Sequence, residues 1–252
     1  HGSRHRRMGV HIGGGVMADK PIIFSAPMVR ALMDWRKTQT RRVLKVQPPE
    51  PCEFAGFYSV PLSGAFQCRF QGDTTIYTQR LPYAVGDRLW VREAHYMTDT
   101  GDYEIAVYAE DANAVQEHFD LINSIAAQHN LADTWKAPHL RLRSPIHMPR
   151  WASRLTLTVT DVRVQRLQDI SEDDAWAEGC RRGDATDNGG YFPADETDPS
   201  GIGWRGWDCA CDWYADLWNS LHGPGAWDAN PWVAAYSFTV QHGNIDTQGD
   251  PQ

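Results

Sequence analysis

The sequence lacks any apolar run near the roughly 20 residues that a membrane-spanning helix needs. It also lacks an export signal of the basic-then-apolar kind, so we expect a cytoplasmic protein. Phosphate-binding glycine loops in the required context, the G-x-S-x-G nucleophile turn and the H-E-x-x-H zinc motif are absent as well. These absences argue against the common nucleotide-binding, serine hydrolase and zinc protease classes.

Cysteine is scarce. Five cysteines in 252 residues form an odd number without framework spacing, and a chain of this length needs no disulfide staples. We therefore expect reduced thiols. Cys209 and Cys211 could supply two thiolates to a metal, but no second pair of ligands lies nearby in the sequence. The sequence thus predicts no metal site and no cofactor.

Positive charge is also limited, because acidic residues outnumber lysines and arginines. The net charge of −8 argues against a protein that holds duplex nucleic acid by bulk phosphate neutralisation. The distribution is uneven, however, because basic runs at 30–45 and 139–166 precede an acidic stretch at 172–216. Either the chain presents a local positive surface on an acidic body, or these arginines are solvated strand residues. The second run contains Arg141, Arg143, Arg150, Arg154, Arg163 and Arg166.

The pattern of the chain indicates one domain. Residues 1–16 have no apolar period and are interpreted as a leader segment outside the fold, followed by a single domain at 17–252. Strand patterns are predicted at 21–25, from 38 onward, and at 88–97, 103–108, 154–166 and 232–240. Helices are predicted from Ser25 to about Lys37 and at 111–131, 171–178 and 211–221. Irregular hairpins are expected at 47–82 and a loop at 181–208. Many strands with scattered helices predict an α+β domain on a mixed or closed sheet.

Lys37 and Thr40 are the first candidates for chemistry. They lie in the run RKTQTRR at a predicted helix-to-strand junction, where an amine and a hydroxyl three residues apart can come within hydrogen-bond reach. Neighbouring arginines lower the pKa of such an amine, and a neutral amine can take the proton of Thr40 to make a nucleophile. The alternative is a basic helix end that complements its own dipole.

Glu178 is the second candidate. It ends the helix predicted at 171–178, where the helix dipole disfavours a carboxylate, and Gly179 follows it directly. Either its helix propensity explains the position, or a cation from elsewhere in the fold holds it.

Four segments in order resemble the ASCH family of the PUA-like superfamily: LMDWRKTQTRR, VGDRLWVRE, DISEDDAWAEG and NPWVAAYSF. Larger members are common in phage and prophage genomes, and smaller ones are N4-acetylcytidine amidohydrolases. The resemblance implies a PUA-like β-barrel core with flanking helices and inserted loops. It places the family's catalytic lysine, threonine and glutamate on Lys37, Thr40 and Glu178, and it makes Arg42, with Arg41 beside it, a candidate substrate contact.

The activity that the resemblance implies is hydrolysis of the exocyclic N4-acyl amide of cytosine nucleosides. Thr40 would attack, Lys37 would carry the proton, and Glu178 would hold Lys37 or shuttle a proton. In a variant of this mechanism, water attacks with Lys37 and Glu178 as the base and Thr40 only orients the substrate. A different class is a non-catalytic RNA- or DNA-binding module that uses exposed aromatic rings and a basic stripe. That stripe comprises Arg141, Arg143, Arg150 and Arg154.

Lys37, Thr40 and Glu178 should line one pocket despite their separation in the chain. This chain is also longer than the small amidohydrolases, with extra sequence at 47–82, 111–145 and 181–208. If these segments surround the mouth of the pocket, bulky and aromatic acyl groups should be accepted.

Overall fold

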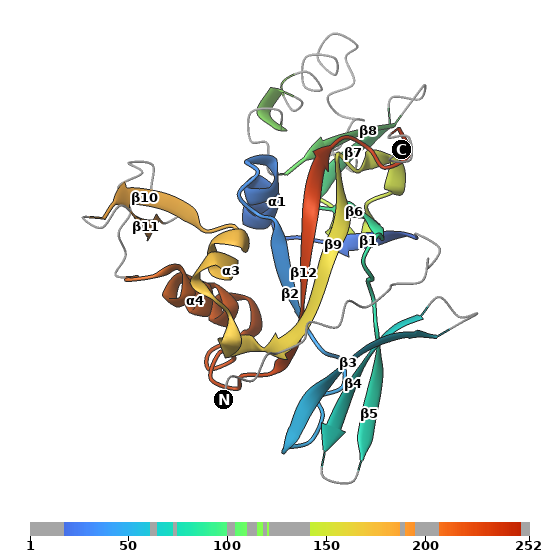
Figure 1. Cartoon of the computed structure of the whole chain (residues 1–252). Coiled ribbons are helices and arrows are strands. Elements are labelled where there is room, and N and C mark those ends of the chain that lie inside the picture. Colours follow the sequence, from blue (N-terminus) through green and yellow to red (C-terminus); the bar gives the residue numbers. More distant parts are fainter. Residues whose placement is uncertain are drawn as a thin grey trace.

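The computed structural model is a mixed α+β fold in which strands predominate (Figure 1). It describes residues 18–60, 65–72, 75–99, 104–109, 115–117, 120, 142–186, 190–194 and 207–247. Most of the helix predicted at 111–131 and the leader at 1–16 lie outside these residues. None of the helices in the described ranges is both long and apolar enough to cross a membrane.

A five-stranded sheet forms the centre of the molecule. Its order is β1 (Asp19–Ile23), β6 (Arg88–Arg92), β9 (Leu155–Arg166), β12 (Trp232–His242) and β2 (Gln39–Val43). β1 runs parallel to β6, and the other pairs are antiparallel. β1 and β2 are edge strands, so the described strands form an open sheet and no closed barrel.

The main core follows from the alternation that the sequence predicted in β9. Leu155, Leu157 and Val159 are at most 1% exposed, and they belong to one core cluster with buried residues of β1, β6 and β12 and with Leu44, which follows β2. α1 (Ala26–Met33) contributes Met28 and Leu32 to the same core.

α1 ends about one turn before the predicted boundary. Trp35 adopts a left-handed conformation with φ of 60° and is 58% exposed, so the chain leaves the helix there instead of continuing to Lys37.

Two antiparallel sheets flank the centre. The segment predicted as irregular hairpins forms an antiparallel meander of β3 (Cys52–Val60), β4 (Ala65–Gly72) and β5 (Ile76–Leu81), with one register shift between Phe54 and Gly56. β7 (His95–Asp99) pairs with β8 (Glu104–Tyr108). The single strand predicted at 88–97 is therefore two strands in different sheets. It breaks at Glu93, a buried carboxylate that accepts hydrogen bonds from Arg154 at 2.9 and 2.8 Å.

α3 (Glu172–Ala177) and α4 (Ala210–His222) pack together around a second core beside the central sheet (Figure 1). This core includes Trp213 and Trp218, whose large rings bury apolar surface there. Part of the predicted loop at 181–208 is a hairpin of β10 (Arg181–Ala185) and β11 (Tyr191–Ala194). Short 3₁₀ turns occur at Pro145–His147, Arg150–Ala152 and Leu167–Asp169.

Candidate active site

The segment between α1 and β2 meets the end of α3. Lys37 and Glu178, 141 positions apart, form an isolated antiparallel bridge, and the Thr38 N–H donates to the Ala177 carbonyl at 2.9 Å. Gly179 permits this approach, with φ of +109° and no side chain. A Cβ there would lie 3.0 Å from the Ala31 Cβ and 3.2 Å from the Lys37 Cβ. The close backbone contact brings two of the predicted residues together.

Lys37 is only 2% exposed. Its Nζ donates to Oε2 and to the backbone carbonyl of Glu178, both at 2.8 Å. Burial lowers the pKa of the Lys37 amine, Glu178 opposes this effect, and the charges of Arg42 and Arg41 lower the pKa further. The Lys37 amine can make three hydrogen bonds, and two of them go to Glu178. One hydrogen-bonding position therefore remains for another partner.

Glu178 is held by cations at both carboxylate oxygens. Lys37 bonds Oε2, and Arg41 Nη1 donates to Oε1 at 2.9 Å. A second nitrogen of Arg41 donates to Asp174 Oδ2 at 2.9 Å, and the Arg41 side chain is 0% exposed. Of the two explanations for a carboxylate at this helix end, the structure supports the one in which cations from elsewhere hold it. The guanidinium of Arg41 thus positions Glu178, and its predicted contact with substrate stays a prediction.

Asp174 continues this network, and sequence reasoning missed it. Its carboxylate accepts from Arg41, from Arg163 at 2.8 Å and from Gln39 at 3.1 Å. Burial alone would raise the pKa of Asp174, but the hydrogen bonds from Arg163 and Gln39 and the nearby charges outweigh it and lower the pKa. The carboxylate ties α3 to strands β2 and β9.

All five predicted site residues line one cavity of about 280 Å³. One side of the cavity is formed by Glu178 and by four residues of the RKTQTRR run: Lys37, Thr40, Arg41 and Arg42. The remaining walls come from residues before and within α1 and from α4. They comprise Ile23, Phe24, Ser25, Met28, Tyr214, Leu217, Trp218, Leu221 and His222. The expected convergence on one pocket is therefore observed.

Thr40 and Arg42 reach the cavity from β2. Thr40 is 5% exposed, and no hydrogen bond joins its hydroxyl to Lys37 among the described residues. Arg42 donates to the Ile23 carbonyl at 2.8 Å, and its guanidinium lies 5.3 Å from the centre of the Phe24 ring. Arg42 is partly exposed, so part of its guanidinium remains accessible to a ligand.

The α4 wall was not recognised as part of a site. The spacing of Tyr214, Leu217, Trp218 and Leu221 predicted an amphipathic helix face, and that face borders both the second core and the cavity. Burial, followed by the charge of Glu178, raises the pKa of the Tyr214 hydroxyl well above its usual range, so the phenol stays neutral. A helical period cannot distinguish a core face from a cavity wall.

The extra segments do not enclose this cavity within the described ranges. None of its lining residues belongs to 47–82, 111–145 or 181–208. The first of these segments instead borders a neighbouring cavity, which Arg42 also lines. The expected loops around the mouth, on which acceptance of bulky acyl groups depended, are therefore not found in the described parts.

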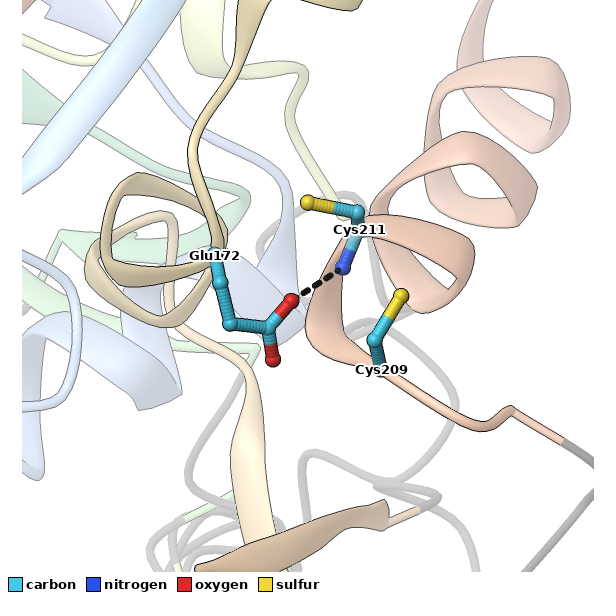
Figure 2. A group of neighbouring side chains, drawn as sticks. All are labelled: Glu172, Cys209 and Cys211. Atoms are coloured by element: carbon cyan, nitrogen blue, oxygen red, sulfur yellow. Dashed lines mark hydrogen bonds between the residues drawn. The ribbon is translucent and has the colours of Figure 1, made fainter.

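Cys209, Cys211 and Glu172 lie close together where α3 and α4 begin (Figure 2), with candidate ligand atoms within 4.8 Å of one another. These groups already cap α4. The Glu172 carboxylate accepts from the backbone N–H of Ala210 at 2.8 Å and of Cys211 at 3.2 Å, and Cys209 Sγ accepts from Asp212. Burial, with nearby Glu172, raises the pKa of Cys211 to about 12. All five cysteines are free, and the absence of a metal stays a prediction.

Two arginines of the basic stripe are already paired. Arg150 forms ion pairs with Asp19 and Asp246, and Arg154 forms an ion pair with Glu93. Arg143 is exposed, and its backbone pairs with His95. Arg141 lies outside the described residues. The predicted RNA contact through this stripe stays untested.

No protein-family model, curated protein or solved structure matches the chain. The ASCH resemblance therefore rests on the four sequence segments, and the chemistry of the cavity is argued from its own contacts.

Proposed function

We propose that this chain is an amidohydrolase that removes acyl groups from the exocyclic N4 amide of cytosine nucleosides. The observation that carries the proposal is a buried Lys37–Glu178 pair that opens onto a cavity with Thr40 in its wall. Perturbed titratable groups in a cavity are the usual mark of acid–base chemistry.

Lys37 is the proton carrier. Its lowered pKa increases the neutral fraction of the amine near neutral pH, and Glu178 fixes two of its three positions. The remaining lone pair of the neutral amine accepts a proton from a hydroxyl in the cavity. Arg41, which bonds both Glu178 and Asp174, keeps the pair in place.

Thr40 is the nucleophile. Its Oγ1 attacks the acyl carbon while Lys37 takes the hydroxyl proton; the carbon–N4 bond then breaks, and the proton passes from Lys37 to N4. Water next gives a proton to the same amine and attacks the acyl–threonine ester; the acyl carbon–Oγ1 bond breaks, Thr40 recovers the proton from Lys37, and the carboxylic acid is released. Arg42 steadies the oxyanion in both steps. In the variant mechanism, water attacks the amide directly and Thr40 only orients the substrate.

The cavity suits a single base with a small acyl group. Its volume of about 280 Å³ is at the small end for ligand pockets. Tyr214 and Trp218 offer flat apolar surface for a ring, while Arg42 and Ser25 supply polar groups near it.

The same proposal assigns the chain to the ASCH family of the PUA-like superfamily. The four similar segments fall on α1 with β2, on β6, on the turn into α3 with the whole of α3, and on β12. They therefore contain the five predicted site residues and all or part of three strands of the central sheet. The assignment rests on these segments, since the described sheet is open.

Deacylation of N4-acetylcytidine, followed by the change in ultraviolet absorbance, tests the proposal. Wild-type protein should turn over, and Lys37→Met should abolish turnover. Thr40→Val should do so as well if Thr40 is the nucleophile, whereas partial activity would favour attack by water. The matched control is Thr38→Val, because Thr38 is exposed and does not line the cavity. Absence of wild-type turnover, or full activity in Lys37→Met, would overturn the proposal.

A further inference from the structure

A second, larger cavity adjoins the candidate active site. Its volume is about 540 Å³, and Arg42 lines both cavities. The walls come from β1, the end of β2, β5 and β12. No acid is among its described lining residues. Four cationic residues line it: Lys20, Arg42, Lys45 and Arg80.

The cations differ in how far they are neutralised. Lys20 donates to Asp87 at 2.6 Å and to the Pro82 carbonyl at 3.0 Å, so its charge is largely offset. Lys45 and Arg80 are exposed, and no hydrogen bond or ion pair within the described part of the chain engages their side chains. Together with Arg42 they give an acidic protein a local positive field that favours an anion.

The floor of this cavity contains a buried donor without a partner. Tyr236 is 0% exposed, and its hydroxyl proton has no acceptor among the residues that the structure describes. Burial raises the pKa of Tyr236, so the hydroxyl keeps its proton. An unpaired buried hydroxyl is unfavourable, and a ligand oxygen within reach would relieve it. Tyr236 also pairs in register with Thr40 of β2, which links this floor to the candidate active site.

We propose that this second cavity, the phosphate cavity, binds the phosphate of a nucleotide whose acylated base occupies the candidate active site. The substrate class is then a phosphate ester of an N4-acylcytosine nucleoside instead of the free nucleoside. Because Arg42 borders both cavities, one ligand of nucleotide size can span them. This inference rests on the proposed function for its base and acyl parts, and on Lys45, Arg80 and Tyr236 for its phosphate part.

Comparison of kcat/KM on N4-acetylcytidine and on its 5′-monophosphate tests the inference. Wild-type protein should prefer the monophosphate. Lys45→Gln combined with Arg80→Gln should reduce that preference by about tenfold for each lost cation, since hydrogen bonds to charged groups contribute at that level. The matched control is Arg69→Gln, which removes an exposed charge from β4 of the same meander outside the cavity and should keep the preference. Equal kcat/KM on the two substrates in wild-type protein would overturn the inference.

A binding measurement separates this inference from the proposed function. Calorimetry should show that cytidine 5′-monophosphate binds more tightly than cytidine, and that inorganic phosphate and the double variant each remove the difference. If no acylated substrate turns over but this pattern holds, the hydrolase proposal fails and the phosphate cavity stands. If nucleosides turn over but the monophosphate gains no affinity, the phosphate cavity is wrong and the hydrolase stands.

The source of the phosphate is decided by a third substrate, a short oligoribonucleotide that carries one N4-acetylcytidine. A preference for the oligoribonucleotide over the monophosphate, lost in the double variant, identifies a nucleic-acid strand as the source. A preference for the monophosphate identifies the free nucleotide. Either result supports the phosphate cavity, and equal loss of activity in Arg69→Gln would contradict it.

Discussion

Glu178 neutralises two buried cations at once, which makes it the residue on which the site depends most. Its oxygens accept from Lys37 at 2.8 Å and from Arg41 at 2.9 Å, and both cationic side chains are at most 2% exposed. Removal of one partner from a buried ion pair leaves a charge without compensation, which costs more than the pair itself contributes.

Glu178→Gln should therefore lower the free energy of unfolding by about 3–5 kcal/mol, because Arg41 and Lys37 lose a shared anion. Urea denaturation at neutral pH measures the change. The control is Asp161→Asn, since Asp161 is 56% exposed and its ion pair with Arg163 is a surface contact; this change should cost at most about 1 kcal/mol. Equal stabilities of the two variants would show that the buried network contributes little.

Removal of the Arg42 charge should shift the pH dependence of the reaction. Burial lowers the pKa of Lys37 most, and the charge of Arg42 lowers it further. In Arg42→Gln this contribution is lost, so Lys37 deprotonates at higher pH and the ascending limb of the kcat/KM profile should move to higher pH. Arg69→Gln serves again as the control for net charge. An ascending limb that stays in place or moves to lower pH would contradict the role of Lys37 as base.

At the scale of single residues, spacing and charge in the sequence could predict part of the site. Lys37 and Thr40 stand out because an amine and a hydroxyl lie three residues apart among arginines, and Glu178 because a helix end disfavours a carboxylate. The role of Arg41 could not be predicted. Neighbouring strand residues point to opposite faces, yet Thr40 and Arg41 both line the cavity, because β2 is an edge strand and α3 comes alongside it. That arrangement depends on pairings between residues more than 130 positions apart.

Gly179 sets the approach of α3 to α1. It has a positive φ, and an added Cβ would lie 3.0 Å from the Ala31 side chain and 3.2 Å from the Lys37 side chain. The contact with Ala31 lies within a packed helix and has little room to adjust. The distance between α1 and the end of α3 is therefore fixed by the absence of one carbon atom.

Gly179→Ala should destabilise the fold by more than the roughly 1–3 kcal/mol of backbone strain alone, and should lower activity by displacing Lys37. Gly223→Ala isolates the strain, because Gly223 has a similar φ of +102° and nothing lies within 4 Å of its added Cβ. Thermal denaturation and deacylation rates should be compared for the two. If Gly223→Ala is equally harmful to activity, the contact with Lys37 is not the cause.

Asp174 joins α3 to β2 and β9, and its lowered pKa makes that junction sensitive to acid. A carboxylate whose pKa is lower in the folded state stabilises the fold above its unfolded pKa, near 3.8, and this contribution is lost as pH falls through the folded pKa. Wild-type protein should thus be more stable than Asp174→Asn at neutral pH, and the gap should narrow below about pH 4. Urea denaturation across this range measures it, and a gap independent of pH would refute the assignment.

Elements were predictable where burial follows one simple period. The apolar residues of β9 recur at every second position and are buried, from Leu155 to Val159 and again at Val162 and Val164, and the predicted bounds of this strand agree with the structure to within one residue. The strand predicted at 88–97 failed because its break depends on Glu93, whose buried pairing with Arg154 leaves no periodic signal. The β10–β11 hairpin was missed because glycine and aspartate in its sequence are typical of loops.

On the scale of the whole molecule, two cavities meet at the edge strand β2. One is bordered by α1 and α4, the other by the β3–β4–β5 meander through Gln79, Arg80 and Leu81. The meander lies in the segment by which this chain exceeds the small amidohydrolases that it resembles. A net charge of −8 combined with a basic cavity favours one local anion over a long stretch of duplex phosphates.

The basic stripe, for which the sequence suggested RNA binding, includes an arginine that acidic residues already hold, Arg150. Arg150 Nη2 donates to Asp19 in β1 at 2.5 Å, and its Nε donates to Asp246 beyond β12 at 2.9 Å. The guanidinium thereby ties together segments 131 and 96 positions away from it. With both its partners acidic, it offers little net positive charge to a phosphate.

Arg150→Gln should therefore lower stability slightly and leave RNA affinity unchanged. The side chain is 37% exposed, so the loss should be at most about 1 kcal/mol in urea denaturation. Fluorescence anisotropy with a labelled single-stranded RNA at two salt concentrations measures affinity. Arg143→Gln is the comparison variant for RNA affinity, because Arg143 is exposed and its contact with His95 is made by the backbone. If Arg150→Gln weakens RNA binding and flattens its salt dependence while stability stays constant, the stripe binds RNA and its ion pairs are incidental.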